Sequence, residues 1–179
     1  MRKLALLAGL CLLPLAAQAV PSEEDKLFSQ LKAADSAEAA KPIEEKLNQL
    51  FRVSGSPSVD LLMSRVGAAL TQADNGTARA RVEAVTRAAP HYAEAWRLKA
   101  HMQQAGGDDT GAMISLQRAV TLNPREFAAM TELAEMLEDY GDKPGALKLY
   151  RRVLALDPQM KVAGERAKAL AKEVEGQGI

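Results

Sequence analysis

Residues 93–126 read AEAWRLKAHMQQAGGDDTGAMISLQRAVTLNPRE, and this stretch decides the fold. The large apolar Trp96 begins one helical stripe, and Ala112 begins a second. Between them stands Gly107-Asp108, where glycine suits a left-handed C-cap and aspartate can cap the next helix. Asn123-Pro124 ends the second stripe, because the residue before a proline is pushed out of the helical conformation. The stretch therefore predicts two helices joined by a tight turn.

The same pattern recurs at an offset of 34 residues, which is a known spacing for repeated helix pairs. The prolines that end the second helix are Pro90, Pro124 and Pro158. The small residues early in the second helix are Ala78, Ala112 and Ala146. Columns of large residues alternate with columns of small ones, as two closely packed antiparallel helices require. The sequence therefore predicts three helix pairs, at residues 59–92, 93–126 and 127–160.

The composition agrees with an all-helical chain. The 179 residues include 33 Ala and 24 Leu, against 19 residues of Val, Ile and Thr together, so helix formers outnumber the residues that strands prefer. Lys and Arg number 23 and Asp and Glu number 23, so the net charge is zero. This balance argues against a disordered tail and against a nucleic-acid-binding basic domain.

These residues resemble the tetratricopeptide repeat family, whose 34-residue unit has a large residue early in its first helix, Gly-Asp at the turn and a final proline. Residues 93–126 and 127–160 match best, and 59–92 is a weaker copy. Lys99 and Gln103 depart from the family's leucine and aromatic residues, so we expect looser packing of that helix. The resemblance implies an all-α solenoid of three repeats with a concave groove lined by the first helices.

Both ends of the repeat array carry further helical patterns. A capping-box pattern from Ser22 opens a predicted hairpin at 22–52, whose apolar residues are Leu27, Phe28, Leu31, Ile43, Leu47, Leu50 and Phe51. Residues 161–176 form an amphipathic capping helix with its apolar face at Val162, Ala163, Ala167, Leu170 and Val174. We expect the hairpin to dock on the solenoid and to cover its first repeat, because the 55–58 linker is short.

Residues 1–19 have the pattern of a secretory signal peptide. Arg2 and Lys3 precede an apolar run that ends in Ala17-Gln18-Ala19, so we expect cleavage after Ala19. An apolar run of about 14 residues is too short for a membrane-spanning helix, which needs roughly 20. The context of Cys11 disfavours a lipidated cysteine. The prediction is export across the inner membrane to the periplasm, with no membrane insertion after cleavage.

The sequence offers no catalytic, cofactor or metal motif. It has two histidines, His91 and His101, and one cysteine inside the leader, so no zinc site can be identified by spacing. No Gly-rich phosphate loop or Gly-x-Ser-x-Gly elbow occurs. A hydrolase using His101 with Glu135 lacks a nucleophile. We therefore predict a protein without enzymatic activity and without a cofactor.

The resemblance implies a partner-binding groove. Carrying the family's groove positions across selects Met63, Leu70, Arg97, His101, Gln104, Thr131, Glu135, Glu138 and Asp139. This groove is apolar at the first repeat, basic at Arg97 and acidic at the third repeat, where we expect His101 beside Glu135. The family variant that clamps a terminal carboxylate needs basic residues and asparagines, which are absent apart from Arg97.

The sequence leaves two functions open. The first is an envelope adaptor that holds a peptide or helix of a partner protein, with a basic stretch attracted by the acidic residues. The alternative is a structural accessory subunit of an envelope enzyme or transporter complex, with the solenoid as a spacer. Apolar residues on the convex side would favour the spacer.

Overall fold

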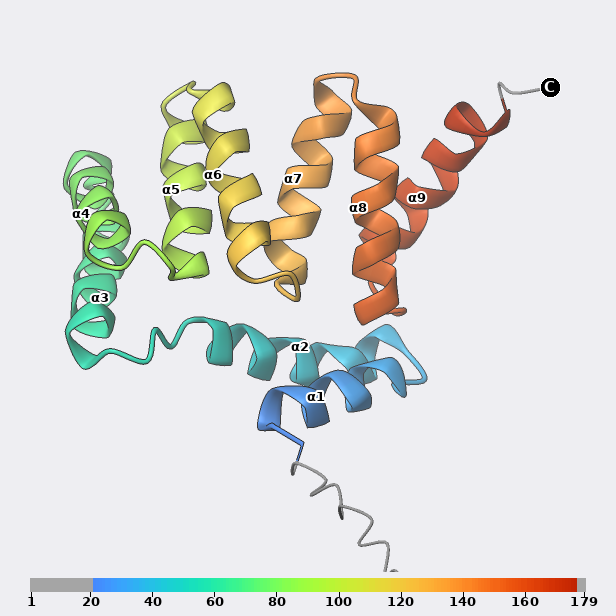
Figure 1. Ribbon diagram of the computed structural model, residues 1–179, viewed down its shortest axis with the longest axis horizontal. Coiled ribbons are helices and arrows are strands. Elements are labelled where there is room, and N and C mark those ends of the chain that lie inside the picture. Colours follow the sequence, from blue (N-terminus) through green and yellow to red (C-terminus); the bar gives the residue numbers. More distant parts are fainter. Residues whose placement is uncertain (1–20, 177–179) are drawn as a thin grey trace, which may run out of the picture.

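The computed structural model describes residues 21–176, and in this part of the chain it contains nine α-helices and no strand. Residues 1–20, with the predicted leader and its cleavage site, lie outside the described residues. The helices are α1 Glu23–Lys32, α2 Ala37–Phe51, α3 Pro57–Thr71, α4 Asn75–Ala88, α5 Ala93–Ala105, α6 Asp109–Leu122, α7 Phe127–Asp139, α8 Lys143–Leu156 and α9 Lys161–Val174. Helices α3 to α8 form three antiparallel pairs that stack side by side, as the predicted α-solenoid requires (Figure 1).

The aspartates at the turns cap the second helix of every pair. The side chains of Asp74, Asp108 and Asp142 each accept a hydrogen bond from a backbone N–H three residues further on. Gly107 and Gly141 precede two of these caps in the left-handed conformation, at φ 78° and 85°. In the first repeat Ala73 takes this conformation at φ 55°, while the nearby Gly76 lies inside α4.

The small column of the repeat lies where the helices of a pair touch. Ala78, Ala112 and Ala146 are fully buried, as close helix packing demands. In α5 a polar contact partly replaces the apolar packing that the family makes at the position of Gln103. Gln103 accepts a hydrogen bond of 2.6 Å from the buried Ser115 hydroxyl, which ties α5 to α6.

The N-terminal hairpin does not cover the outer face of the first repeat, which corrects that expectation. In Figure 1 α1 and α2 cross below the solenoid, along the edge where one repeat turns into the next. The turn after α2 redirects the chain, with Gly55 at φ 78° and Ser54 N–H donating to Asp60 Oδ1 at 2.9 Å. The hairpin therefore braces the inter-repeat turns while the outer face of α3 stays uncovered, with Leu61 55% exposed.

Contacts from the hairpin reach the turns that follow α4, α6 and α8. Arg52 C=O accepts a hydrogen bond of 2.6 Å from the Tyr92 hydroxyl. Gln159, in the turn after α8, donates to Ala34 C=O at 2.9 Å. At the middle turn Phe28 and Phe51 lie with their ring centroids 6.4 Å from that of Phe127. These contacts hold α2 against the edge of the solenoid.

The apolar core is divided into two clusters. The larger one joins the hairpin to the second and third repeats and to α9, and the smaller one belongs to the first repeat and the facing side of α5. Helix α9 covers the third repeat with Ala163, Ala167 and Leu170, whereas Val162 points to solvent and is 49% exposed. Within residues 21–176 no helix is long and apolar enough to span a membrane.

Candidate functional site

The predicted groove residues come from three helices, and the structure brings together those of α5 and α7. His101 and Gln104 of α5 share a pocket with Glu135 and Asp139 of α7, and Arg97 lies one turn before His101 on α5. Thr131 and Glu138 of α7 instead contact Met160 and Arg166 on the α9 side. Met63 and Leu70 of α3 are half-buried against the separate core of the first repeat. The polar part of the groove is therefore the surface between the second and third repeats.

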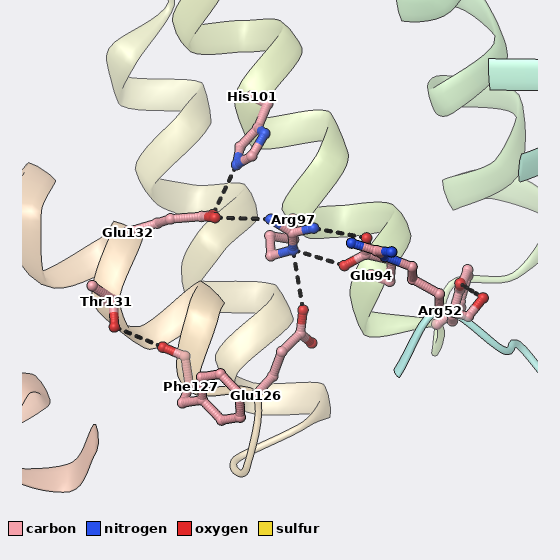
Figure 2. A network of polar contacts seen from close by, with 9 residues as sticks. Arg52, Glu94, Arg97, His101, Glu126, Phe127, Thr131 and Glu132 are labelled. Carbon is pink, nitrogen blue, oxygen red and sulfur yellow. Dashed lines mark hydrogen bonds and ion pairs between the residues drawn. The ribbon is translucent and has the colours of Figure 1, made fainter. Parts of the chain in front are cut away.

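Arg97 does not supply the free positive charge that the sequence suggested. Its guanidinium binds Glu94 in a bidentate pair at 2.7 and 2.8 Å and lies 2.8 Å from Glu132 Oε1 (Figure 2). Glu126 Oε1 lies 3.3 Å from Arg97 Nε. Burial lowers the pKa of Arg97, but Glu94 and Glu132 outweigh burial and raise it. Since one guanidinium faces three carboxyl groups, this part of the groove has no cation to offer a ligand.

Glu126 is a buried carboxyl that sequence reasoning missed. Its side chain is 2% exposed, and its Oε2 has no hydrogen-bond partner in the described structure. Burial, with the neighbouring Glu94, raises the pKa of Glu126 to about 8. The repeat alignment could have identified it. Tyr92, Glu126 and Met160 are 34 positions apart, and each is the residue before a helix, α5, α7 or α9. A carboxylate at a position that Tyr92 and Met160 fill in the other copies indicates a buried charge with a partner nearby.

His101 pairs with a different acid from the predicted one. Its Nε2 lies 2.9 Å from Glu132 Oε2, so Glu132 bridges His101 and Arg97 (Figure 2). Glu135 lies one turn further along α7 and lines a pocket of about 100 Å³ together with His101. The reason is geometric: in neighbouring first helices, residue 101 faces residue 132 more directly than the in-frame residue 135.

The pocket between α5 and α7 is acidic. Gln104 contributes an amide, and Glu132, Glu135 and Asp139 contribute carboxylates. Burial and the charges of Glu132 and Asp139 raise the pKa of Glu135, because adjacent carboxylates disfavour its ionised form. Neither Glu135 nor Asp139 has an ion-pair partner among the described residues. A cation placed here would relieve this repulsion.

Glu138 is not free to bind a partner cation, which corrects the expectation that it contributes to an acidic groove at the third repeat. Arg166 of α9 binds it through two nitrogens, and the Glu138 side chain is 13% exposed. Glu138 and Arg166 line a second pocket of about 240 Å³ with Tyr150 and Val162. Glu135 and Asp139 line both pockets and so form the wall between them.

Thr131 is occupied within its own helix. Its hydroxyl donates to Phe127 C=O at 2.8 Å and leaves no free donor (Figure 2). Within residues 21–176 no group of three or more His, Cys, Asp or Glu side chains is arranged to hold a metal ion. The arrangement can attract and orient a positively charged group at Glu135 and Asp139.

Comparison with known proteins agrees with this architecture. Residues 65–124 and 115–161 match the family model described as tetratricopeptide repeat. A TPR repeat-containing protein of Rhizobium etli is 28% identical over 152 residues, which span 85% of this chain and 74% of that protein.

Two solved structures show the same fold at low sequence identity. The type III secretion chaperone SycD of Yersinia enterocolitica, in complex with a peptide of the translocator YopD, has a TM-score of 0.57 and 16% identity. The match covers 69% of this chain and 97% of that one. The first TPR domain of RPAP3 (Spaghetti), bound to an HSP90 peptide, has a TM-score of 0.58 and 18% identity over 65% of this chain and 93% of that one.

Proposed function

Because the chain belongs to the tetratricopeptide repeat family, we propose that it is a non-enzymatic adaptor that holds a segment of a partner protein on its concave face. The segment lies across α5 and α7 and places a lysine or arginine between Glu135 and Asp139. Peptides bound to SycD and to the RPAP3 domain support a peptide as the ligand class.

The observation that carries the proposal is the unbalanced charge of this surface. Arg97 and His101 are already engaged by Glu132, and Arg166 is engaged by Glu138. Glu135 and Asp139 remain exposed and without an ion-pair partner among the described residues. A partner cation gains two carboxylates here and displaces no existing pair.

The two pockets indicate which residue types of the partner segment lie over each of them. The pocket between α5 and α7 is lined mainly by polar groups, and the pocket toward α9 adds Tyr150 and Val162. A basic side chain over Glu135 and Asp139 would therefore be followed by a residue that contacts Val162. We expect a short motif of a basic residue next to an apolar one.

Quantitative capture from envelope extract of the native host tests the proposal. Wild type and Glu135→Gln/Asp139→Asn are compared by mass spectrometry of the retained proteins. The variant should lose most of its specific partner, and raised salt should reproduce that loss in the wild type, because the attraction is electrostatic. Glu138 is left unchanged because it binds Arg166 and joins α7 to α9.

A matched control removes two charges elsewhere. Glu83→Gln/Glu165→Gln has the same charge change, and neither residue lines the two pockets. It should retain the partner. Equal retention by the pocket variant and by this control would contradict a role for Glu135 and Asp139 and move the search to Met63, Leu70 or the hairpin.

The alternative is a structural accessory subunit in which the solenoid is a spacer. Ile114 on α6 favours it, because this large apolar side chain on a second helix is 62% exposed. A spacer would keep its partner in Glu135→Gln/Asp139→Asn and lose it in Ile114→Glu. The two results separate the two functions.

The proposal includes export to the periplasm, supported by the charge, apolar run and small-x-small pattern of residues 1–19. Protein purified from its native host should begin at Val20. Sequencing that finds Met1, or mass spectrometry that finds a lipid on Cys11, would contradict the periplasmic assignment while leaving the groove untouched.

A further inference from the structure

A groove of about 460 Å³ lies between α8 and α9, separate from the concave surface. Its apolar lining includes Leu147 and Ala155 of α8 and Val174 of α9. Leu147 is buried at 3% exposure, and Val174 is half-buried. None of the groove's residues lines the acidic pockets, so the two surfaces can be tested independently.

The rim of this groove is positively charged. Lys148, Arg151 and Arg152 line it, and all three are exposed. Arg151 binds Glu175 with contacts of 2.7 and 3.0 Å. Lys148 and Arg152 have no ion-pair partner among residues 21–176. Two positive charges therefore border an apolar floor without a counter-ion.

This charge belongs to the last repeat and is not a feature of the repeat pattern. The residues 34 positions before Lys148, Arg151 and Arg152 are Ile114, Gln117 and Arg118. The equivalent positions of the first repeat are Ala80, Glu83 and Ala84. Only the third repeat carries three cations there.

The groove runs along α8 for about three helical turns. Its lining residues on α8 recur every three to four positions, at Pro144, Leu147, Lys148, Arg151, Arg152 and Ala155. Val174 and Glu175, at the end of α9, form its other side. A groove of this length along one helix has room for a second helix packed alongside it.

We propose that this groove binds an amphipathic helix of a second protein, with apolar residues on the floor and acidic residues against Lys148 and Arg152. Charge complementarity and the length of the groove along α8 select this occupant. The protein then has two binding faces of opposite charge, acidic on the concave side and basic between α8 and α9. One molecule can bring a basic segment and an acidic helix together.

A synthetic peptide tests the inference without knowledge of the natural partner. The probe is a fluorescein-labelled amphipathic helix of about four turns, with a leucine stripe flanked by glutamates. Fluorescence anisotropy at low salt should give saturable binding to the purified protein. Peptides with Ser in place of Leu, or Gln in place of Glu, should each bind about tenfold more weakly.

Variants of the protein locate the binding. Lys148→Glu/Arg152→Glu should weaken binding about tenfold or more. Arg65→Glu/Lys168→Glu makes the same charge change at exposed residues outside the groove and should change binding less than about twofold. Circular dichroism shows whether both variants are folded. Glu135→Gln/Asp139→Asn should leave this titration unchanged, which separates this inference from the proposed function.

Three results would overturn the inference. The first is equal affinity of the groove variant and its charge-matched control. The second is undiminished binding of the Gln peptide, which would show that charge has no role. The third is a dimer in sedimentation velocity that dissociates on Lys148→Glu/Arg152→Glu, because the occupant would then be a second copy of this chain.

Discussion

Ala73 adopts a backbone conformation that glycine takes at the same place in the other two repeats. Its φ of 55° is left-handed, while the equivalent Gly107 and Gly141 have φ of 78° and 85°. A side chain with a Cβ costs roughly 1 kcal/mol in this region, because the Cβ approaches the following carbonyl oxygen. The turn of the first repeat is therefore strained at one residue.

Replacing Ala73 by glycine should relieve this strain. We expect Ala73→Gly to raise the free energy of unfolding by roughly 0.5 kcal/mol, since the relief exceeds the added flexibility of the unfolded chain. Urea unfolding measures the change. Ala68→Gly, at an exposed interior position of α3, should instead lower it by roughly 1 kcal/mol. A loss of stability in Ala73→Gly would show that its conformation is unstrained.

Glu126 makes stability depend on pH in an unusual direction. With its pKa raised to about 8, the folded protein keeps a proton that the unfolded chain releases near 4.5. The folded state therefore binds more protons between about pH 5 and 8, so stability falls as pH rises through this window. The pKa values of Glu44 and Asp157, which meet between α2 and the turn after α8, are also raised, mainly by burial, and act in the same direction.

Glu126→Gln should reduce this dependence, because glutamine stays neutral at every pH. Between pH 6 and pH 8.5 the wild type should lose stability on the order of a few kcal/mol, and the variant should lose clearly less. Chemical unfolding at several pH values measures both slopes, with the exposed Glu165→Gln as a control that keeps the wild-type slope. Identical slopes for all three proteins would show that Glu126 ionises normally.

At the scale of elements, the hairpin adds contacts that the repeats alone do not make. Phe28 of α1 is 3% exposed and packs against Phe51 and Phe127. Arg125, in the turn before α7, lies 4.1 Å above the Phe28 ring and binds Asp25 at 2.7 Å. One aromatic side chain therefore joins the hairpin to the middle of the solenoid.

Phe28→Ala should lower the free energy of unfolding by about 3 kcal/mol, because it leaves a cavity beside the rings of Phe51 and Phe127. Thermal unfolding measures the loss. Val53→Ala removes an exposed apolar side chain just after α2 and should have little effect. A small effect of Phe28→Ala would mean that the hairpin contributes little to the stability of the repeats.

The 34-residue pattern predicted the features that depend on neighbouring residues. The caps at Asp108 and Asp142 and the buried alanines Ala112 and Ala146 follow from local spacing. The course of the hairpin did not, because it depends on a five-residue turn and on Phe28 meeting Phe127 about 100 positions later. In the candidate site, too, local features were predictable and long-range contacts were not. The acids on α7 were predictable, but their partners Arg97 and Arg166 come from helices whose register only the packing determines.

At the scale of the whole molecule, stability is unevenly distributed. The first repeat has its own small core and an uncovered outer face, whereas the hairpin, the second and third repeats and α9 share one continuous core. Regions with few buried contacts open more readily than the rest of a protein. The first repeat is therefore the weakest part of the array.

Native-state hydrogen exchange should show this difference directly. Amides of α3 and α4 should exchange faster than those of α7 and α8, although the four helices have similar lengths. The amides of α2 should exchange at about the same rate as those of α7, because the two helices belong to the same core. Equal protection in all three repeats would contradict the division of the core.

The crossing hairpin also affects the order in which the chain can fold. Stacked repeats alone can form one after another as they are synthesised, since each contacts only its neighbours. Here the hairpin is made first, yet its partners Arg125 and Gln159 follow 100 and 125 positions later. The aromatic surface of the hairpin stays exposed until Arg125 and Phe127, at the start of the third repeat, have been synthesised. The hairpin can therefore complete its packing only after the second repeat has been made, and a chain interrupted before α7 would expose that surface to a chaperone.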